Sequence, residues 1–278
     1  MNKVSVFGGT GFIGSAFCKK NADPIVIPRQ NVKPESDTVV YFISTVDNYN
    51  IFTDSTLDIQ TNLIHLMKVL EECKASVKEF IFISSWFVYG NTELPVKETS
   101  PCKPKGFYSI TKHTAEMMLE FFCKTHGINY KIIRLGNVIG SGDTKVSKKK
   151  NVLQYLINEM RYNRDITLYK NGNFTRDFIY IQDVIDGIYH IMHHCPVNEI
   201  YNLSSGVPVL YSEVIKYARK KINSSSAILP MSITPFQESI QIDKAHIDVT
   251  KLRQLGFTSR YSIYDMIDIL AESENAPN

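Results

Sequence analysis

A glycine-rich turn near the start of the chain constrains the fold more than any other feature. The segment 4–7 has the β-branched and aromatic residues of a short strand, and four glycines follow it: Gly8, Gly9, Gly11 and Gly14. Between a strand and a helix, this spacing allows positive φ, close approach to a pyrophosphate, and helix amides aimed at the anion. The turn therefore predicts a dinucleotide site, with contacts expected from Gly8, Gly11, Phe12, Ile13 and Gly14. A purely structural turn is the alternative.

Apolar strands alternate with helical stretches through the first half of the chain. The segments 37–45 and 79–85 are apolar runs typical of strands buried on both faces of a parallel sheet. Helices are predicted over 57–73 and 107–125. This alternation predicts an α/β fold, a doubly wound Rossmann-type parallel sheet with helices on both faces.

After residue 140 the pattern loosens into short strands and helices. We interpret this region as a smaller C-terminal cap that shares a substrate cleft with the first half. The predicted division is 1–140 for an NAD(P)-binding Rossmann domain and 141–278 for mainly the cap, with segments that return to the Rossmann domain.

Charge and composition exclude several other classes of protein. The 278 residues carry 31 basic and 28 acidic side chains, and a net charge of +3 gives no electrostatic case for nucleic acid. We expect no signal peptide and no membrane span, because long uninterrupted apolar runs are missing.

Five cysteines without a CxxC pair are expected to be reduced thiols of a cytoplasmic protein. The pair His193-His194 ends a predicted helix, where the dipole favours cations, so no metal site is predicted.

A tyrosine and a lysine four residues apart lie at the start of the helix predicted over 107–125. The sequence YSITK places the Tyr108 phenol and the Lys112 ammonium on one helix face. A nearby cation favours phenolate, so we expect Lys112 to lower the pKa of Tyr108 and make it a general acid/base for a sugar hydroxyl. Ser85 ends the preceding strand, where its hydroxyl can hydrogen-bond the oxygen that Tyr108 titrates.

Six blocks in this order resemble the extended short-chain dehydrogenase/reductase superfamily, in particular its NAD(P)-dependent nucleotide-sugar epimerases and dehydratases. The resemblance extends from residue 3 to about 257 and is carried by GGTGFIG, ISSWFVYG, YSITK, RLGNVIGSGD, RDFIYIQDV and YNLSSG. It implies a Rossmann-type enzyme that binds NAD or NADP and a nucleotide-diphosphate sugar. The helices 57–73 and 107–125 often pair two subunits in this family, which implies a homodimer.

The resemblance also assigns roles to individual residues. The implied catalytic residues are Ser85, Tyr108 and Lys112. Besides the glycine turn, the implied cofactor contacts are Arg29, Ser44, Thr45, Asn62, Tyr108 and Lys112. The implied substrate contacts are Ser85, Trp86, Asn137, Asn151, Val152 and Arg176. The guanidinium of Arg176 suits the diphosphate of the substrate. The alternative role for Arg176 is an internal salt bridge to Asp177 or Asp183.

Two departures from the family pattern concern the adenosine end of the cofactor. The family usually has an acidic residue after the second strand, and Arg29 stands there instead, which favours the 2′-phosphate of NADP over NAD. A solvated loop arginine is the alternative. The short stretch between Arg29 and the next strand leaves no room for a helix–strand crossover, so one such unit is predicted to be missing or vestigial.

These features favour a nucleotide-sugar epimerase that acts at C4 through a transient 4-keto sugar. Trp86 and Phe87 occupy positions where family dehydratases carry proton-transferring acidic residues, so dehydration is disfavoured. Arg29 and a shortened adenine pocket suit an exchangeable NADPH, and hence a nucleotide-sugar 4-ketoreductase as the alternative. A non-catalytic NAD(P)-binding regulator is a third possibility.

Overall fold

The computed structural model describes residues 3–20, 23–143 and 146–273. In chain order, with η for short 3-10 helices except the π-helix η2, the elements are β1 (Val4–Phe7), α1 (Phe12–Lys20), β2 (Pro24–Ile27), β3 (Thr38–Tyr41), η1 (Asn50–Phe52), α2 (Leu57–Ile59), η2 (Gln60–Ile64), α3 (His65–Cys73), β4 (Glu79–Ser85), η3 (Trp86–Tyr89), α4 (Phe107–His126), β5 (Asn129–Leu135), β6 (Asn137–Ile139), α5 (Val152–Arg161), β7 (Ile166–Leu168), η4 (Tyr169–Gly172), β8 (Thr175–Tyr180), α6 (Ile181–His194), β9 (Glu199–Leu203), β10 (Pro208–Leu210), α7 (Tyr211–Lys221), β11 (Ile228–Pro230), α8 (Pro235–Ile240), α9 (Thr250–Gln254) and α10 (Ile263–Ser273).

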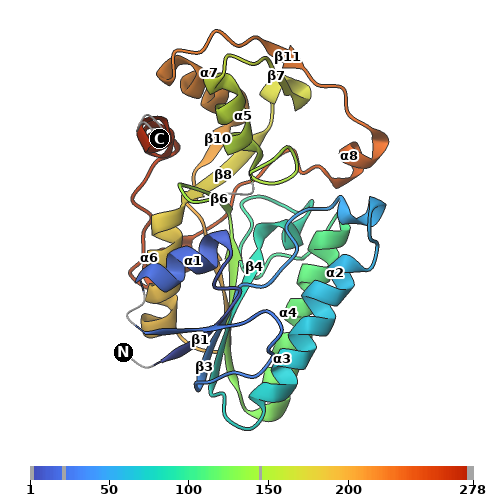
Figure 1. The fold of residues 1–278 in the computed structure, drawn as a ribbon, viewed down its shortest axis with the longest axis vertical. Coiled ribbons are helices and arrows are strands. Elements are labelled where there is room, and N and C mark those ends of the chain that lie inside the picture. Colours follow the sequence, from blue (N-terminus) through green and yellow to red (C-terminus); the bar gives the residue numbers. More distant parts are fainter. Residues whose placement is uncertain (1–2, 21–22, 144–145, 274–278) are drawn as a thin grey trace.

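Six parallel strands form the main sheet, in the order β2-β1-β3-β4-β5-β9. Helices α1 and α6 cover one face, and α2, α3 and α4 cover the other (Figure 1). The strand side chains alternate between two apolar cores: Val40 packs on the α1 and α6 side, whereas Val39 and Tyr41 pack on the α3 and α4 side. The predicted doubly wound Rossmann-type α/β fold is confirmed.

The connection from β2 to β3 is a loop without a helix or a strand. The predicted loss of one helix–strand unit is therefore confirmed, and it leaves β2 at the edge of the sheet. Serine hydroxyls hold this loop against β1: the Ser5 amide donates to Ser36 Oγ at 2.8 Å, and the Glu35 amide donates to Ser5 Oγ at 2.8 Å.

The later part of the chain builds a smaller layer above the carboxyl edge of the main sheet (Figure 1). It contains a three-stranded sheet of β10, β8 and β6 and the parallel pair β11 and β7, flanked by α5 and α7. Two later elements lie with the Rossmann sheet instead: β9 extends it beside β5, and α6 packs on α1. The division into 1–140 and 141–278 stays a prediction.

The helix predicted over 57–73 has a π-helical turn in its middle, at η2. A π turn adds one residue to the helix and is frequent at functional sites. Here it contains Asn62, which is buried. Among the described residues, no helix is both long enough and apolar enough to cross a membrane.

Candidate active site

The glycine turn between β1 and α1 is tightly folded backbone. Gly8 has φ +81°, which disfavours residues with a Cβ atom. The Gly11 amide donates to the Gly8 carbonyl at 3.1 Å, and a Cβ atom at Gly14 would lie 2.2 Å from the same carbonyl oxygen. The turn thus brings the start of α1 close to the end of β1, as a pyrophosphate site at a helix N-terminus requires.

Asn62 links the segment after β3 to the start of α4. Its Oδ1 accepts from the Thr45 amide at 2.9 Å and from the Ser44 hydroxyl at 3.2 Å. Its Nδ2 donates to the hydroxyls of Thr45 at 2.8 Å and Thr111 at 2.9 Å. The Thr111 hydroxyl donates to the Tyr108 carbonyl at 3.0 Å, so the network reaches the helix turn that carries Tyr108. Three residues with predicted cofactor contacts, Ser44, Thr45 and Asn62, therefore lie in one polar network.

The half-buried Tyr108 side chain lies at the start of α4, with its phenol near the hydroxyls of Ser85 and Ser44 at the ends of β4 and β3. Its amide donates to Asn48 Oδ1 at 3.0 Å, and Gly106 permits this contact because a Cβ atom there would lie 2.1 Å from that oxygen. Burial raises the pKa of Tyr108, although the two serine hydrogen bonds oppose the rise. The expected lowering of this pKa is wrong, because burial outweighs the stabilisation of phenolate.

Lys112 lies one turn further along α4 and is 2% exposed. Its ammonium donates to the Ile83 carbonyl at 2.7 Å and lies 4.2 Å from the centre of the Phe82 ring. Burial lowers the pKa of Lys112 to about 7, with partial opposition from Glu116. The ammonium is thus bound to strand β4, which explains why it does not produce the expected effect on Tyr108.

Aromatic residues directly after Ser85 line the same end of β4. The Ser85 hydroxyl accepts from the Phe87 amide at 3.3 Å, which caps η3. The Phe87 ring meets the Tyr108 ring edge to face at 6.4 Å, and Trp86 packs on Phe87 at 4.5 Å. Trp86 is 3% exposed, and its buried Nε1 has no hydrogen-bond partner among the described residues.

The predicted substrate contacts from the later half lie where β6, α5 and β8 meet. Asn137 Nδ2 donates to the Asp177 carbonyl at 2.8 Å. Asn151 precedes α5 with φ +53°, and its Nδ2 donates to the Val138 carbonyl at 3.4 Å. Val152 begins α5 and is 42% exposed. The structure therefore places Asn137 next to β8 and joins Asn151 to β6.

Arg176 on β8 donates to carbonyl oxygens rather than to carboxylates. Its Nη1 contacts the Thr175 carbonyl at 2.8 Å and the Ile242 carbonyl at 2.7 Å. The guanidinium lies 4.6 Å from the Phe174 ring and 5.9 Å from the Trp86 ring, and burial lowers the pKa of Arg176 to about 10.

The two carboxylates considered as partners of Arg176 are occupied elsewhere. Asp177 accepts from the hydroxyls of Ser204 at 2.6 Å and Ser205 at 2.7 Å, and Asp183 pairs with Arg260 at 3.3 Å. The alternative of an internal salt bridge from Arg176 to Asp177 or Asp183 is therefore wrong.

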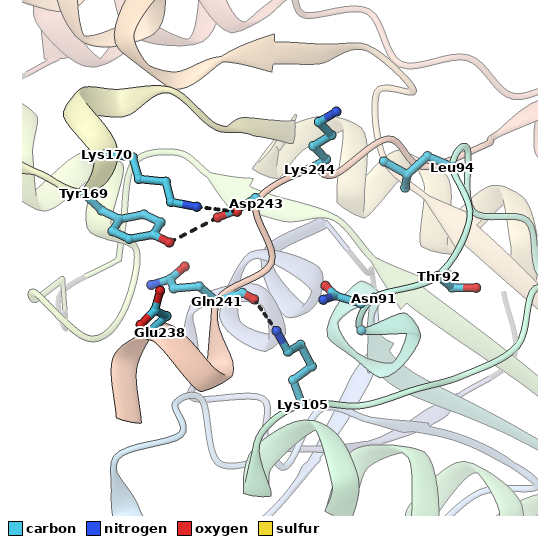
Figure 2. Close-up of a pocket in the computed structure, with 11 residues that line it drawn as sticks. Asn91, Thr92, Leu94, Lys105, Tyr169, Lys170, Glu238, Gln241, Asp243 and Lys244 are labelled. Carbon is cyan, nitrogen blue, oxygen red and sulfur yellow. Dashed lines mark hydrogen bonds and ion pairs between the residues drawn. The ribbon is translucent and has the colours of Figure 1, made fainter. Parts of the chain in front are cut away.

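Gln241, a hydrogen-bond partner of Arg176, lines a pocket of about 340 Å³ (Figure 2). Its lining residues are Gly90, Asn91, Thr92, Leu94, Lys105, Tyr169, Lys170, Glu238, Gln241, Asp243 and Lys244. Gln241 Oε1 accepts from Arg176 at 3.4 Å, and its carbonyl accepts from Lys105 at 3.0 Å. Lys170 donates to Asp243 at 2.6 Å. The sequence analysis did not identify this pocket, because its lining comes from separate segments without a common motif.

Arg29 is exposed in the loop after β2. Since β1 and β2 are parallel and in register from Val4 with Pro24 to Phe7 with Ile27, this loop and the glycine turn leave the sheet at the same edge. Asn48 and Thr111 hydrogen-bond the Tyr108 backbone, and Asp58 accepts from Thr45 in the same polar network, but none of the three was predicted. They lie outside the sequence blocks or at unmarked positions within them, so no sequence signal identified them.

Comparisons with known proteins agree with this architecture. The chain is 24% identical to a putative UDP-glucose 4-epimerase of Methanocaldococcus jannaschii, over 91% of this chain and 92% of that protein. It is 24% identical to the dTDP-4-dehydro-6-deoxyglucose reductase of Escherichia coli, over 89% of this chain and 77% of that protein. The crystal structure of a Thermotoga maritima UDP-glucose 4-epimerase with UDP-glucose superimposes with a TM-score of 0.87, at 22% identity and 97% coverage of both chains.

The sequence pattern of one family covers most of the chain. Residues 29–204 match the NAD dependent epimerase/dehydratase family. The match includes Ser44 after β3, Ser85 at the end of β4 and Tyr108 at the start of α4, and the glycine turn precedes it. The protein is therefore an enzyme that belongs to the NAD dependent epimerase/dehydratase family and uses a nicotinamide dinucleotide as its cofactor.

Proposed function

We propose that this protein is a nucleotide-sugar 4-epimerase that works through a transient 4-keto sugar. The observation that carries the proposal is the position of the Tyr108 phenol, which lies near the Ser85 and Ser44 hydroxyls where β4 and β3 end. These strands run parallel to β1, so their carboxyl ends share one edge of the sheet with the glycine turn. A dinucleotide held at that turn and a sugar at Tyr108 would meet along this edge.

In the proposed reaction, Tyr108 takes the proton of the sugar 4-hydroxyl and later returns it to the 4-keto oxygen. Ser85 hydrogen-bonds the same oxygen and orients it. A nicotinamide dinucleotide, held at the glycine turn, would supply the hydride acceptor and donor. Rotation of the keto sugar between the two hydride transfers exposes its other face and inverts C4. We assign Lys112 to the nicotinamide ribose. To bind the ribose, its ammonium would have to give up its hydrogen bond to the Ile83 carbonyl.

Arg176 is the proposed contact for the diphosphate of the nucleotide sugar. Its hydrogen bonds go to two backbone carbonyls and the Gln241 side chain, so its positive charge is not neutralised by them. The adjoining pocket of about 340 Å³ offers room for part of the nucleotide, with Lys105 and Lys170 on its wall. Asn137, Asn151 and Val152 are assigned to the same ligand.

A nucleotide-sugar 4-ketoreductase that uses NADPH is the second candidate. The loop from β2 to β3 favours it, because the missing helix–strand unit shortens the region expected to cover adenine. A less covered dinucleotide exchanges more readily, as a reductase requires in each turnover. The similarity to the Escherichia coli reductase also supports the ketoreductase.

One experiment separates the two candidates. The purified protein is examined for absorbance from bound dinucleotide, and then incubated with a panel of nucleotide sugars and 4-keto sugar nucleotides, with and without NADPH. Bound dinucleotide and interconversion of C4 epimers without added NADPH support the epimerase. Reduction that consumes NADPH in proportion to product supports the ketoreductase, and no conversion under either condition contradicts both.

The proposed acid/base predicts the behaviour of Tyr108→Phe. This variant keeps the ring that packs on Phe87 and lacks only the phenolic oxygen, so folding and dinucleotide binding are expected to persist. Turnover should fall about 10²–10⁴-fold, the usual contribution of a positioned acid/base. Steady-state rates and a dinucleotide titration check this. A variant that keeps more than about a third of the wild-type rate, with chemistry limiting, would show that Tyr108 is not the acid/base.

We also propose a homodimer formed through α4. Ile110 (44% exposed), Met117 (52%) and Phe121 (75%) recur at spacings of seven and four along this helix, which places them on one exposed face. Ile64, in the neighbouring η2, is 42% exposed. A second copy of the chain would bury this apolar surface.

A further inference from the structure

Lys105 brings a positive charge to the pocket that Gln241 lines. It is half-buried, lies just before α4, and points toward the Gln241 backbone (Figure 2). Its ammonium donates to the Gln241 carbonyl at 3.0 Å, and this neutral oxygen is its only hydrogen-bond partner among the described residues. The charge of Lys105 is therefore not balanced by a carboxylate within ion-pair distance.

Arg176 binds the same short segment as Lys105. Its guanidinium donates to Gln241 Oε1 at 3.4 Å and to the Ile242 carbonyl at 2.7 Å. Two cations, one from the segment before α4 and one from β8, thus meet at neutral oxygens of two consecutive residues. The carboxylate that follows them, Asp243, pairs with a third cation of the pocket at 2.6 Å. Like charges that meet in this way repel each other, so the arrangement favours an anion beside them.

The pocket borders both segments that carry proposed catalytic residues. Gly90, five residues after Ser85, lines it, as does Lys105, three residues before Tyr108. A β-bridge between Gly90 and Lys103 joins the two segments. A sugar that reached Ser85 and Tyr108 would therefore carry its substituents, or the phosphate attached to it, close to the Lys105 ammonium.

We propose that Lys105 is a substrate-binding residue, whose ammonium gives up the Gln241 carbonyl and binds an anionic group of the nucleotide sugar next to the group that Arg176 binds. This inference rests on the proposed function and names a further contact of the same site. Two groups of a nucleotide sugar have the required chemistry: the phosphate attached to the sugar, and a carboxylate on an acidic sugar. The exchange is favourable because a hydrogen bond between an ammonium and an anion is stronger than one to a neutral carbonyl.

The test compares the binding of two pairs of ligands by calorimetric titration. UMP and UDP differ by the second phosphate, and UDP-glucose and UDP-glucuronic acid differ by the sugar carboxylate. If Lys105 binds the phosphate, Lys105→Met should weaken UDP roughly tenfold more than UMP. If Lys105 binds the carboxylate, the variant should weaken UDP-glucuronic acid roughly tenfold more than UDP-glucose. Lys103→Met, at an exposed lysine two residues earlier, is the matched control and should change neither ratio.

The outcomes separate a ligand contact from a merely structural role. Equal weakening of all four ligands by Lys105→Met would show that Lys105 only holds the Gln241 segment, and no weakening would show that it does not reach the ligand. Either result overturns the inference. Lys105→Arg keeps the charge and should keep most of the binding, and Lys105→Ala is judged by the same limits if Lys105→Met does not fold. Binding that is independent of Lys105 contradicts this inference alone, whereas a wild type that binds none of the four ligands contradicts the proposed function as well.

Discussion

Burial governs the ionisation of the two side chains that start helix α4. Tyr108 is half-buried and Lys112 is buried, and desolvation favours the neutral form of each, so the pKa of Tyr108 rises and that of Lys112 falls. Neighbouring groups only partly oppose these shifts: Ser44 and Ser85 lower the pKa of Tyr108, and Glu116 raises the pKa of Lys112. At this site, desolvation outweighs the charge pairing that a four-residue spacing suggests.

The lowered pKa of Lys112 predicts a pH-dependent stability. The pKa is about 7 in the folded chain against 10.5 for a free lysine, so between these values the unfolded chain binds more protons. The free energy of unfolding contributed by Lys112 should therefore rise with pH in this window, by about 1.4 kcal/mol per pH unit where the two states differ by a whole proton.

Urea unfolding of wild type and Lys112→Met at pH 7, 8 and 9 checks this prediction. The stability of the wild type relative to the variant should increase with pH. Lys124→Met, at an exposed lysine of the same helix, should show no such trend. A constant difference between wild type and Lys112→Met across this range would contradict the lowered pKa.

Arg29 predicts the choice of dinucleotide. Its guanidinium is exposed after β2, where it would attract a 2′-phosphate, so NADP(H) should bind about tenfold more tightly than NAD(H). Arg29→Asp should invert this preference, and salt should weaken it because the site is exposed. Dissociation constants for both dinucleotides at low and high salt decide the matter. Equal affinities, or tighter binding of NAD(H) by wild type, would show that Arg29 does not reach the ribose.

At the scale of elements, the turn between β1 and α1 contains glycines that are required for two different reasons. At Gly14 a Cβ atom would lie 2.2 Å from the Gly8 carbonyl oxygen, so the helix could not approach the strand. At Gly11 the same test gives 3.4 Å, an ordinary contact. Gly14 is thus required for folding of the turn, whereas Gly11 is assigned to close approach of the dinucleotide.

This difference predicts opposite results for two alanine variants. Gly14→Ala should lower the free energy of unfolding by about 1–3 kcal/mol, because backbone must move. Gly11→Ala should change it by less than about 1 kcal/mol and yet weaken dinucleotide binding. Denaturant unfolding and a dinucleotide titration of both variants provide the comparison. Equal stability losses would argue against the separation of roles.

At the scale of the whole molecule, one apolar core runs from the Rossmann sheet into the cap. The cluster that contains Val6 and Val40 of the sheet also contains Leu153 of α5 and Val214 of α7. A second contact joins Trp86, after β4, to Ile242 and Ile247 of the late segment. The cap is therefore packed on the sheet above the strand ends, and the pocket beside Arg176 lies between segments from both parts.

The proposed dimer predicts the effect of a charge on α4. Phe121→Glu would place a carboxylate in the proposed apolar interface. Because Phe121 is 75% exposed in the single chain, this variant should convert the dimer to a monomer without loss of folded stability. Tyr162→Glu, at a residue 71% exposed at the end of α5, is the control and should remain a dimer. Sedimentation velocity on both variants gives the result. A wild-type protein that is monomeric at micromolar concentration would contradict the proposal.

The sequence by itself determined the fold class and the missing crossover. Gly8 and Gly14 sit in a strand–turn–helix context that few other folds use, and strands such as 79–85 are apolar enough to require cover on both faces. The short stretch after Arg29 excluded a helix–strand unit by length alone. These conclusions depend on local spacing and composition, which the sequence records directly.

Only the tertiary structure decided the electrostatics and the pocket. Which group meets the Lys112 ammonium depends on how α4 packs against β4, and it is the Ile83 carbonyl rather than Tyr108. Asp58 reaches the Tyr108 network because a π turn and the segment after β3 bring distant residues together. Burial and long-range contacts set these properties, and neither can be obtained from spacing along the chain.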